Sequence, residues 1–253
     1  MKVICFVNNK GGVGKTSSVQ NVGAGLARKG FKVVLIDVDP QSNLTISFGI
    51  DKYAVEHDAG DFMLGSKTFE EVAMSSDNLS IIPASDKLDK KERVLQGENM
   101  YHTFLRRKLR AIESFDYCLI DCPPALGAMT VNALYASDYF FVPLQAEFFS
   151  YEGIRKILHF TAEIQQETDL RLGGVFATRF NPRERRKLSR DLVDSTAQQL
   201  GDRYMANCNI RVNIAVSEAQ AAGEDVFSYA PTSNSAKDYE ALTDEIIQRT
   251  THG

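Results

Sequence analysis

The stretch NKGGVGKT, residues 9–16, follows an apolar run and precedes a helical pattern. Closely spaced glycines let successive backbone N–H groups turn inward around an anion, and a helix that begins directly behind them adds positive dipole. In the standard phosphate loop, G-x-x-x-x-G-K-[ST], the lysine reaches the β- and γ-phosphates and the hydroxyl binds Mg²⁺. Lys15 and Thr16 fit these two roles, whereas Asn9 stands where the first glycine would be and Lys10 adds a second cation. The stretch therefore predicts a site for a phosphate chain and Mg²⁺.

Short apolar runs alternate with helical patterns along the chain, which is typical of a parallel sheet built from strand–helix–strand units. Residues 3–7 and 33–36 have the composition of buried strands, and between them Val19, Val22 and Leu26 recur at helical spacing. The pattern predicts an α/β fold with a doubly wound, mostly parallel sheet flanked by helices. The six predicted strands cover residues 3–7, 33–36, 79–82, 117–120, 139–144 and 174–177.

The composition excludes several classes of protein. Hydrophobic residues make up 43% of the 253 residues and charged residues 25%, which excludes a disordered, collagen-like or coiled-coil chain. No apolar run approaches the roughly 18 residues that cross a bilayer, and no signal peptide is indicated. The four cysteines form no C-x-x-C pair, so neither a disulfide framework nor a zinc ribbon is expected. We expect a single domain in the cytoplasm. Only residues 50–76 lack a regular pattern, and short helices are expected there.

The charge is unevenly distributed. The net charge is −4, but residues 179–190 carry six basic residues against the single acidic Glu184. A basic stretch of this kind is usually a solvated helix face, and it is also the feature that binds nucleic-acid phosphates. Both interpretations are open at this point.

Further stretches fit one family. Residues 10–16 match K-G-G-x-G-K-[ST], the deviant Walker A motif of the ParA/MinD family of ATPases. The chain therefore resembles this family, and within it the ParA (Soj) branch, over nearly its whole length. The resemblance implies a P-loop NTPase fold, one ATPase domain over residues 1–253, slow intrinsic hydrolysis of ATP, and Mg²⁺ as a cofactor. The other matching stretches are residues 34–41 (VLIDVDPQ), 118–124 (CLIDCPP), 142–147 (VPLQAE), 152–153 (EG), 217–219 (SEA) and 235–239 (SAKDY).

The acidic residues of two of these stretches suit a metal site. A carboxylate at the end of a buried strand is costly to bury unless a cation or hydrogen bonds satisfy it, and Mg²⁺ can do so. Asp121 suits the Mg²⁺ shell, and Asp37 and Asp39 would share a face if their strand continued past them. The resemblance implies that Asp39 orients the attacking water and that Asp37 supports the metal shell. The alternative is that these are strand-end aspartates that cap the following turns. The metal-binding residues are predicted to be Thr16, Asp37 and Asp121, and the catalytic residues Lys10, Lys15 and Asp39.

The resemblance also assigns Lys10 and the nucleotide contacts. In the family this lysine reaches across a homodimer to the partner's bound phosphates, so that ATP joins the two subunits. The alternative for Lys10 is a solvated side chain. The resemblance implies contacts to adenine from Thr178, Arg179 and Asn181 and from residues 210–213. The predicted nucleotide-binding residues are Lys10, Gly11, Gly12, Val13, Gly14, Lys15, Thr16, Ser17, Thr178, Arg179, Asn181 and Arg211.

A dimer favours the nucleic-acid interpretation of the basic stretch, because it doubles the number of clustered basic residues. Nonspecific affinity for DNA needs clustered Lys and Arg and no element that reads bases. A basic position that relatives use for DNA is Ala215 in this chain, and Arg211 could substitute for it. We therefore expect contacts to double-stranded DNA in the ATP state. The predicted DNA-binding residues are Arg183, Arg185, Arg186, Lys187, Arg190 and Arg211.

The sequence also bears on other partners. Residues 238–253 carry four acidic residues and one arginine, so they do not form the basic amphipathic helix with which MinD-type relatives bind membranes. The resemblance implies a nucleoid-associated protein in the cytoplasm, released from DNA when a ParB-like or other cargo-bound protein stimulates hydrolysis. The output would be the positioning of a chromosome, a plasmid or a protein cargo. Two alternatives remain: a positioning ATPase that acts on a protein scaffold without DNA, and a metabolic P-loop phosphotransferase.

Overall fold

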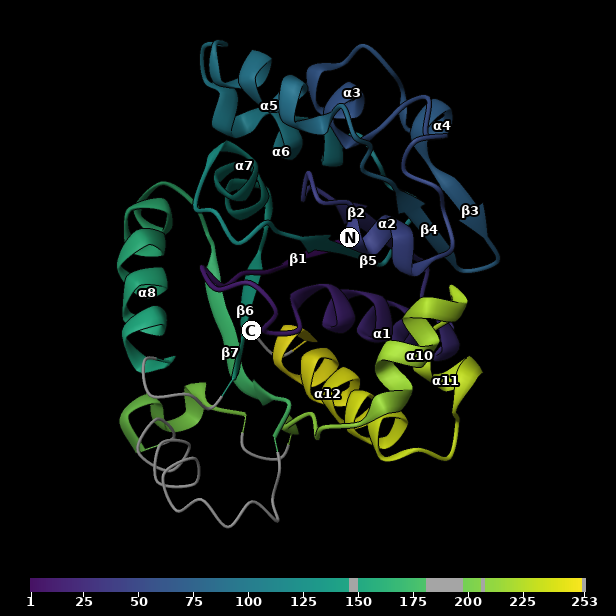
Figure 1. The fold of residues 1–253 in the computed structure, drawn as a ribbon. Coiled ribbons are helices and arrows are strands. Elements are labelled where there is room, and N and C mark those ends of the chain that lie inside the picture. Colours follow the sequence, from purple (N-terminus) through teal and green to yellow (C-terminus); the bar gives the residue numbers. More distant parts are fainter. Residues whose placement is uncertain (146–149, 181–197, 206–207, 252–253) are drawn as a thin grey trace.

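The computed structural model describes residues 1–145, 150–180, 198–205 and 208–251. Asn181 and the basic residues of the stretch 183–190 lie outside the described residues. Within the described part, seven strands form one sheet in the order β3-β4-β2-β5-β1-β6-β7 (Figure 1). All neighbouring strands are parallel except β3 and β4. The strands are β1 (Lys2–Phe6), β2 (Val33–Asp37), β3 (Met74–Ser76), β4 (Leu79–Ile82), β5 (Tyr117–Asp121), β6 (Tyr139–Gln145) and β7 (Arg171–Thr178).

Helices cover both faces of this sheet (Figure 1). One face carries α1, α10, α11 and α12, and the other carries α3 and the helices from α5 to α8. The predicted doubly wound α/β fold is confirmed. The helices are α1 (Lys15–Arg28), α2 (Asn43–Ser47), α3 (Ala59–Leu64), α4 (Phe69–Val72), α5 (Leu88–Gln96), α6 (Phe104–Leu109), α7 (Ala128–Ala136), α8 (Ser150–Glu167), α10 (Ile214–Ala222), α11 (Val226–Tyr229) and α12 (Asn234–Thr251), with 3₁₀ turns at Tyr101–Thr103 and Gly201–Arg203.

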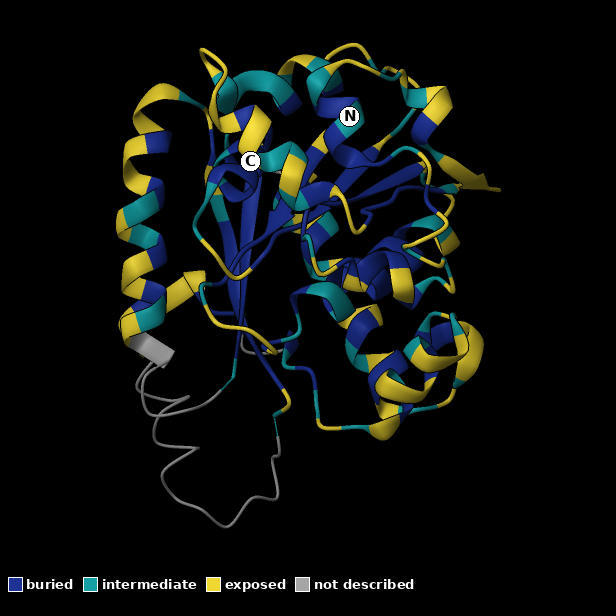
Figure 2. Ribbon diagram, turned by 45° about the horizontal axis from the view of Figure 1, so that its top comes forward, coloured by how far each residue is buried: buried dark blue, intermediate teal, exposed yellow. Residues whose placement is uncertain are grey.

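The central strands are apolar on both sides because each side faces a layer of helices. In β1, Val3 and Cys5 belong to the core beneath α5–α8, whereas Ile4 and Phe6 belong to the core beneath α1 and α12. Strands β2 and β5 are buried along their whole length. Figure 2 shows these strands buried between helices whose outer surfaces are exposed. The unbroken apolar runs in the sequence are thus the central strands, which contribute to a hydrophobic core on each face of the sheet.

The carboxyl ends of three central strands meet at one edge of the sheet. The register pairs Asp121 at the end of β5 with Phe6 at the end of β1 and with Asp37 at the end of β2. Parallel strands all end at the same edge, so the phosphate loop that follows β1 lies beside both acidic stretches. In open α/β sheets this edge, where the connections diverge to opposite faces, is where ligands bind.

One strand was missed by the sequence pattern. Strand β3 lies in the irregular stretch 50–76, and its three residues are all exposed. It pairs antiparallel with β4 across a tight turn in which Asp77 has a φ of 42°. With no buried face, the strand has no apolar alternation to reveal it. The Asp77-Asn78 pair was the available signal, because such residues favour two-residue hairpin turns. The short helices expected in the same stretch are confirmed as α3 and α4.

A buried polar cluster joins α3 to α5. The Asp58 carboxylate accepts hydrogen bonds from the N–H groups of Gly60 (2.9 Å) and Asp61 (3.2 Å), and Asp61 accepts one from the N–H of Asp58 (3.1 Å). The Lys91 ammonium of α5 contacts both carboxylates, at 2.9 Å from Asp58, and the Ser85 hydroxyl donates to Asp58. This capping box satisfies the first N–H groups of α3, and Lys91 supplies the opposite charge.

The stability that Asp61 contributes is expected to depend on pH. Partial burial by itself raises the pKa of Asp61, but the hydrogen bonds from Lys91 and from the Asp58 N–H outweigh it, so the pKa lies below its usual value. A carboxyl whose pKa is lower in the folded chain stabilises the fold above its unfolded pKa of about 3.9, and this contribution disappears as the pH falls. We expect Asp61→Asn to lower the free energy of unfolding by about 1 kcal/mol at pH 7 and by less below pH ~4, as measured by urea unfolding. Glu70→Gln, at an exposed position of α4, is the control, and an equal loss at both pH values would contradict the prediction.

Candidate nucleotide-binding site

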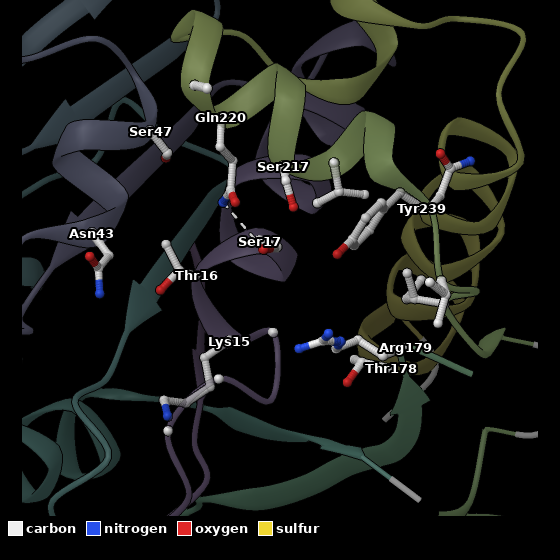
Figure 3. A pocket seen from close by; sticks show the side chains of 18 of the residues that line it. Lys15, Thr16, Ser17, Asn43, Ser47, Thr178, Arg179, Ser217, Gln220 and Tyr239 are labelled. Atoms are coloured by element: carbon white, nitrogen blue, oxygen red, sulfur yellow. Dashed lines mark hydrogen bonds between the residues drawn. The ribbon is translucent and has the colours of Figure 1, made fainter. Parts of the chain in front are cut away.

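A cavity of about 900 Å³ opens at the carboxyl edge of the sheet. Its floor is the phosphate loop, and its walls come from α2, from the end of β7 and from α10, as Figure 3 shows. A volume of this size is typical of a site for a cofactor or another small molecule. The predicted residues that line it are Gly11, Gly12, Gly14, Lys15, Thr16, Ser17, Asp39, Thr178, Arg179 and Arg211.

The shape of the phosphate loop depends on glycine and on hydrogen bonds from neighbouring strands. Gly14 has a φ of 86°, a left-handed backbone that favours glycine, and a Cβ there would lie close to the Thr178 side chain, at 3.3 Å. The Thr178 hydroxyl donates to the carbonyl of the buried Val13 at 2.7 Å, and the Gln145 amide donates to the Gly12 carbonyl at 3.1 Å. The loop is therefore held by β6 and β7 before any ligand binds.

Lys15 lies inside this loop. Its side chain is buried, and its ammonium donates to the carbonyls of Asn8 and Lys10, both at 3.1 Å. Burial lowers the pKa of Lys15, while the nearby Asp121 raises it. The cation is thus placed at the base of the cavity, where it can transfer its hydrogen bonds from carbonyls to phosphate oxygens. Lys10 differs, because it is exposed at the surface of the loop.

Thr16 and Asp121 form the part of the site that best fits a metal ion. The Thr16 hydroxyl lies 2.7 Å from Oδ2 of Asp121, and the buried Oδ1 of Asp121 has no hydrogen-bond partner among the described residues. Burial, and then the charge of Asp37, raise the pKa of Asp121 well above its usual value. A buried carboxylate with one unsatisfied oxygen and an adjacent hydroxyl fits a hard cation such as Mg²⁺, which prefers oxygen ligands.

The two aspartates of the stretch 34–41, Asp37 and Asp39, make different contacts. Asp37 ends β2 and is completely buried, and its carboxylate accepts hydrogen bonds from Asp39 N (3.1 Å), Thr45 N (2.9 Å) and the Thr45 hydroxyl (2.7 Å). Burial raises the pKa of Asp37 to about 7, although these bonds oppose the shift. Asp39 lines the cavity, and its Oδ1 accepts the Gln41 N–H at 2.9 Å. The condition for a shared face is not met, because β2 ends at Asp37 and a turn begins at Asp39, whose carbonyl accepts the Ser42 N–H at 2.8 Å.

Three of the predicted adenine-contacting residues, Thr178, Arg179 and Arg211, line the cavity. Thr178 ends β7, and Arg179 follows it with a φ of 50° and points into the cavity (Figure 3). Such a left-handed backbone is uncommon outside glycine and often occurs at functional sites. Arg211 lines the cavity too, but its guanidinium pairs with Asp238 of α12, at 2.6 Å between Nη2 and Oδ1. Asp238 also accepts the Arg211 N–H at 2.9 Å, so this part of the wall is anchored to α12.

The sequence did not point to the opposite walls. Figure 3 shows side chains from α2 and α10, and Tyr239 from α12, around the same space. The amide of Gln220 donates to the Ser17 hydroxyl at 3.2 Å, which joins α10 to the start of α1. The available signal was the SEA stretch at residues 217–219, which marked α10 without assigning it a role. The unpredicted wall residues labelled in Figure 3 are Asn43, Ser47, Ser217, Gln220 and Tyr239.

Gln20 holds these two walls together. Its side chain is completely buried, and its amide nitrogen donates to the carbonyl of Ser47 at the end of α2 (2.7 Å) and of Glu224 beyond α10 (3.0 Å). Next to it the backbones of Gly49 and Gly223 meet, because a Cβ on Gly223 would lie 3.1 Å from the Gly49 backbone. The spacing between α2 and α10 is therefore set from α1, beneath the cavity.

The fold and the site together define the class of the protein as a P-loop nucleotide-binding protein of the α/β type. Comparisons with known proteins identify the family. A family model described as an AAA domain matches residues 1–173. The chromosome-partitioning ATPase Soj of Treponema pallidum is 36% identical over 253 residues, which cover 98% of each chain. The sporulation initiation inhibitor protein Soj of Bacillus subtilis is 35% identical over 250 residues, which cover 97% of this chain and 98% of the other.

A solved structure with the same fold holds a nucleotide analog. Cobyrinic acid a,c-diamide synthase from Mycobacterium smegmatis, with a bound ATP analog and magnesium, has a TM-score of 0.79 and 29% identity, covering 99% of this chain and 96% of the other. This chain belongs to the ParA/Soj family of partition ATPases. It is an ATPase whose cofactors are ATP and Mg²⁺, which confirms the predicted activity and cofactors. None of the helices among the described residues combines the length and the apolar composition needed to span a bilayer.

Proposed function

We propose that this chain is an ATP-dependent dimerising switch that binds DNA nonspecifically in its ATP state and positions or segregates a chromosome, a plasmid or a protein cargo. The contrast between the two lysines of the phosphate loop carries the proposal. Lys15 is buried and turned into its own loop, whereas Lys10 is exposed at the loop's surface. Because Lys15 already serves the chain's own nucleotide, we infer that Lys10 contacts the phosphates bound to a second copy.

The residues of the cavity divide the work of hydrolysis. Lys15 and the loop N–H groups would bind the phosphate chain, and Thr16 with Asp121 would hold Mg²⁺, which neutralises phosphate charge. Asp39, on the cavity wall, would orient the attacking water. Asp37 already accepts three hydrogen bonds from protein groups, so we infer that it supports the metal site from behind, without contacting the ion. Phosphoryl transfer depends mainly on such positioning and charge neutralisation.

DNA binding is inferred from charge. The basic stretch 183–190 carries Arg183, Arg185, Arg186, Lys187 and Arg190 on a chain that is acidic overall. Five clustered cations on each of two subunits suit phosphate contacts that need no base recognition. Arg211 is the less favourable DNA contact, because its guanidinium is engaged by Asp238. We infer a cytoplasmic, nucleoid-associated protein whose hydrolysis is stimulated by a ParB-like or other cargo-bound partner.

Light scattering after size exclusion tests the dimer. With ATP and Mg²⁺, the slowly hydrolysing Asp39→Ala protein is expected to have twice the monomer mass of 28.1 kDa, and to be monomeric with ADP. Adding Lys10→Ala to this protein is expected to remove the dimer while nucleotide binding persists. Lys90→Ala, an exposed lysine of α5, is the matched control. A dimer that is unaltered by Lys10→Ala would refute the cross-subunit role.

A salt series on random duplex DNA tests the output of the switch. We expect the protein to bind DNA with ATP and not with ADP. The affinity is expected to fall steeply between about 50 and 200 mM salt, with a slope that grows with the number of phosphates contacted. A dimer without affinity for DNA would instead support a positioning ATPase on a protein scaffold. Rapid turnover with a small-molecule acceptor and no dimer would support a metabolic phosphotransferase.

A further inference from the structure

The hydroxyl of Thr45 joins Asp37, at the end of β2, to Ala84, in the segment that follows β4. It donates to Oδ2 of Asp37 at 2.7 Å and accepts the N–H of Ala84, beyond β4, at 2.8 Å. Thr45 and Asp37 are both completely buried. Because solvent does not reach this pair, a hydrogen bond lost here could not be replaced by one to water, and its loss would leave a buried polar group unpaired.

The position of Thr45 in α2 explains what the pair does. Helix α2 has five residues and starts after Ser42, which has a φ of 60° and makes no side-chain cap. A helix this short is unstable by itself and needs partners for its first N–H groups. Asp37 supplies one, because its Oδ2 accepts the Thr45 N–H at 2.9 Å as well as the hydroxyl. Asp37 thus acts as the helix cap from eight residues away.

The same carboxylate closes the turn that carries Asp39. Its other oxygen, Oδ1, accepts the Asp39 N–H at 3.1 Å, so one side chain holds both the beginning of this turn and the helix after it. Asp39, Asn43 and Ser47 on this segment all line the nucleotide cavity. If the Thr45 hydroxyl were lost, Asp37 would keep a single donor from α2, and the Ala84 N–H would lose its acceptor.

We propose that Thr45 is a positioning residue for ATP hydrolysis, which sets the place of Asp39 through Asp37 without touching the nucleotide. The proposal rests on the proposed role of Asp39. It assigns to residues 37–45 one rigid unit, closed by hydrogen bonds to a single carboxylate and anchored at Ala84 in the segment that follows β4. Catalytic groups must be held closely in place, and small displacements by remote changes reduce the rate without removing binding.

The test compares Thr45→Val, which keeps the shape and removes the hydroxyl, with Thr45→Ser, which keeps the hydroxyl. Single-turnover ATP hydrolysis and the Kd of a fluorescent ADP are measured on the full chain. We expect Thr45→Val to lower the hydrolysis rate at least about tenfold while the Kd changes less than about threefold, and Thr45→Ser to stay within about threefold of the wild type in both. Thr161→Val in α8 is the control, since this buried hydroxyl donates only to the carbonyl of Leu158 in its own helix.

Three outcomes would decide against the proposal. If Thr45→Val hydrolyses ATP at the wild-type rate while Asp39→Ala is slow, the role of Thr45 is overturned and that of Asp39 stands. An unchanged rate in Asp39→Ala would overturn the role of Asp39 and this route with it. Equal losses of rate and affinity would indicate a purely structural threonine. If Thr45→Val does not fold, Thr45→Cys replaces it, because Cys is close to Ser in size and a weaker donor, and the same split against Thr45→Ser is expected.

Discussion

Lys15→Ala is expected to abolish nucleotide binding, with an affinity for ATP and for ADP at least about 100-fold weaker than in the wild type. The reason is the position of the cation at the base of the cavity, 3.1 Å from the carbonyls of Asn8 and Lys10. A buried ammonium that is already partly dehydrated makes strong charge-assisted bonds to phosphate. Isothermal titration with ATP and Mg²⁺, and separately with ADP, measures the loss.

The matched control for Lys15→Ala lies in the same loop. Lys10→Ala removes an exposed cation five positions before Lys15 and is expected to leave the affinity of the monomer for ADP within about threefold of the wild type. Because Lys15 also holds its own loop, circular dichroism and a melting curve must show that Lys15→Ala is folded. Tight ADP binding by a folded Lys15→Ala protein would mean that the phosphates lie elsewhere.

Asp39→Ala is expected to lower the rate of ATP hydrolysis by about 100-fold or more while ATP binding is largely retained. Of the two aspartates in the stretch 34–41, Asp39 lines the cavity, whereas Asp37 accepts a hydrogen bond from the Thr45 hydroxyl. Removing a group that orients water affects the chemical step and leaves the phosphate contacts in place. Phosphate release in a single turnover, compared with the Kd for ATP, separates the two effects.

Asp39→Asn is the informative companion variant. Asparagine keeps an oxygen that can accept the Gln41 N–H, so the turn is preserved while the charge is lost. We expect Asp39→Asn to hydrolyse ATP as slowly as Asp39→Ala. Full activity of Asp39→Asn would show that the side chain matters for the turn and not as a charged group beside the water. Full activity of both variants would remove Asp39 from the reaction.

Much of the fold could be predicted because its strands and helices are encoded by the order of apolar and polar residues within short segments. Strands that are buried on both faces appear as unbroken apolar runs, and the six predicted runs correspond to β1, β2, β4, β5, β6 and β7. Boundaries moved by a few residues, most of all in β7, which extends from Arg171 to Thr178. Strand β3 was missed since it buries none of its residues and therefore has no pattern to detect.

The candidate site, too, has parts that the sequence predicts and parts that it does not. The loop from Lys10 to Thr16 is contiguous and its chemistry follows from residue type and order, so the sequence alone predicts its role. The resemblance implied different roles for Asp37 and Asp39, but the residues alone did not predict that Asp37 bonds to Thr45 while Asp39 lines the cavity. These contacts depend on where β2 ends and on a hydroxyl in the next helix. The α10 wall was not predicted either, since Gln220 meets Ser17 across 203 positions of sequence.

The sequence by itself determined the class of fold, the phosphate loop and the acidic strand ends, because each is encoded by neighbouring residues whose periodicity or spacing is a local property. Only the tertiary structure decided which carboxylate faces the cavity, that Asp37 caps α2, that Gln20 spaces the two walls and that Asp238 engages Arg211. These arrangements join segments that are remote in the sequence. The free energy of such a contact depends on the geometry and burial that the whole fold creates, and no single segment contains that information.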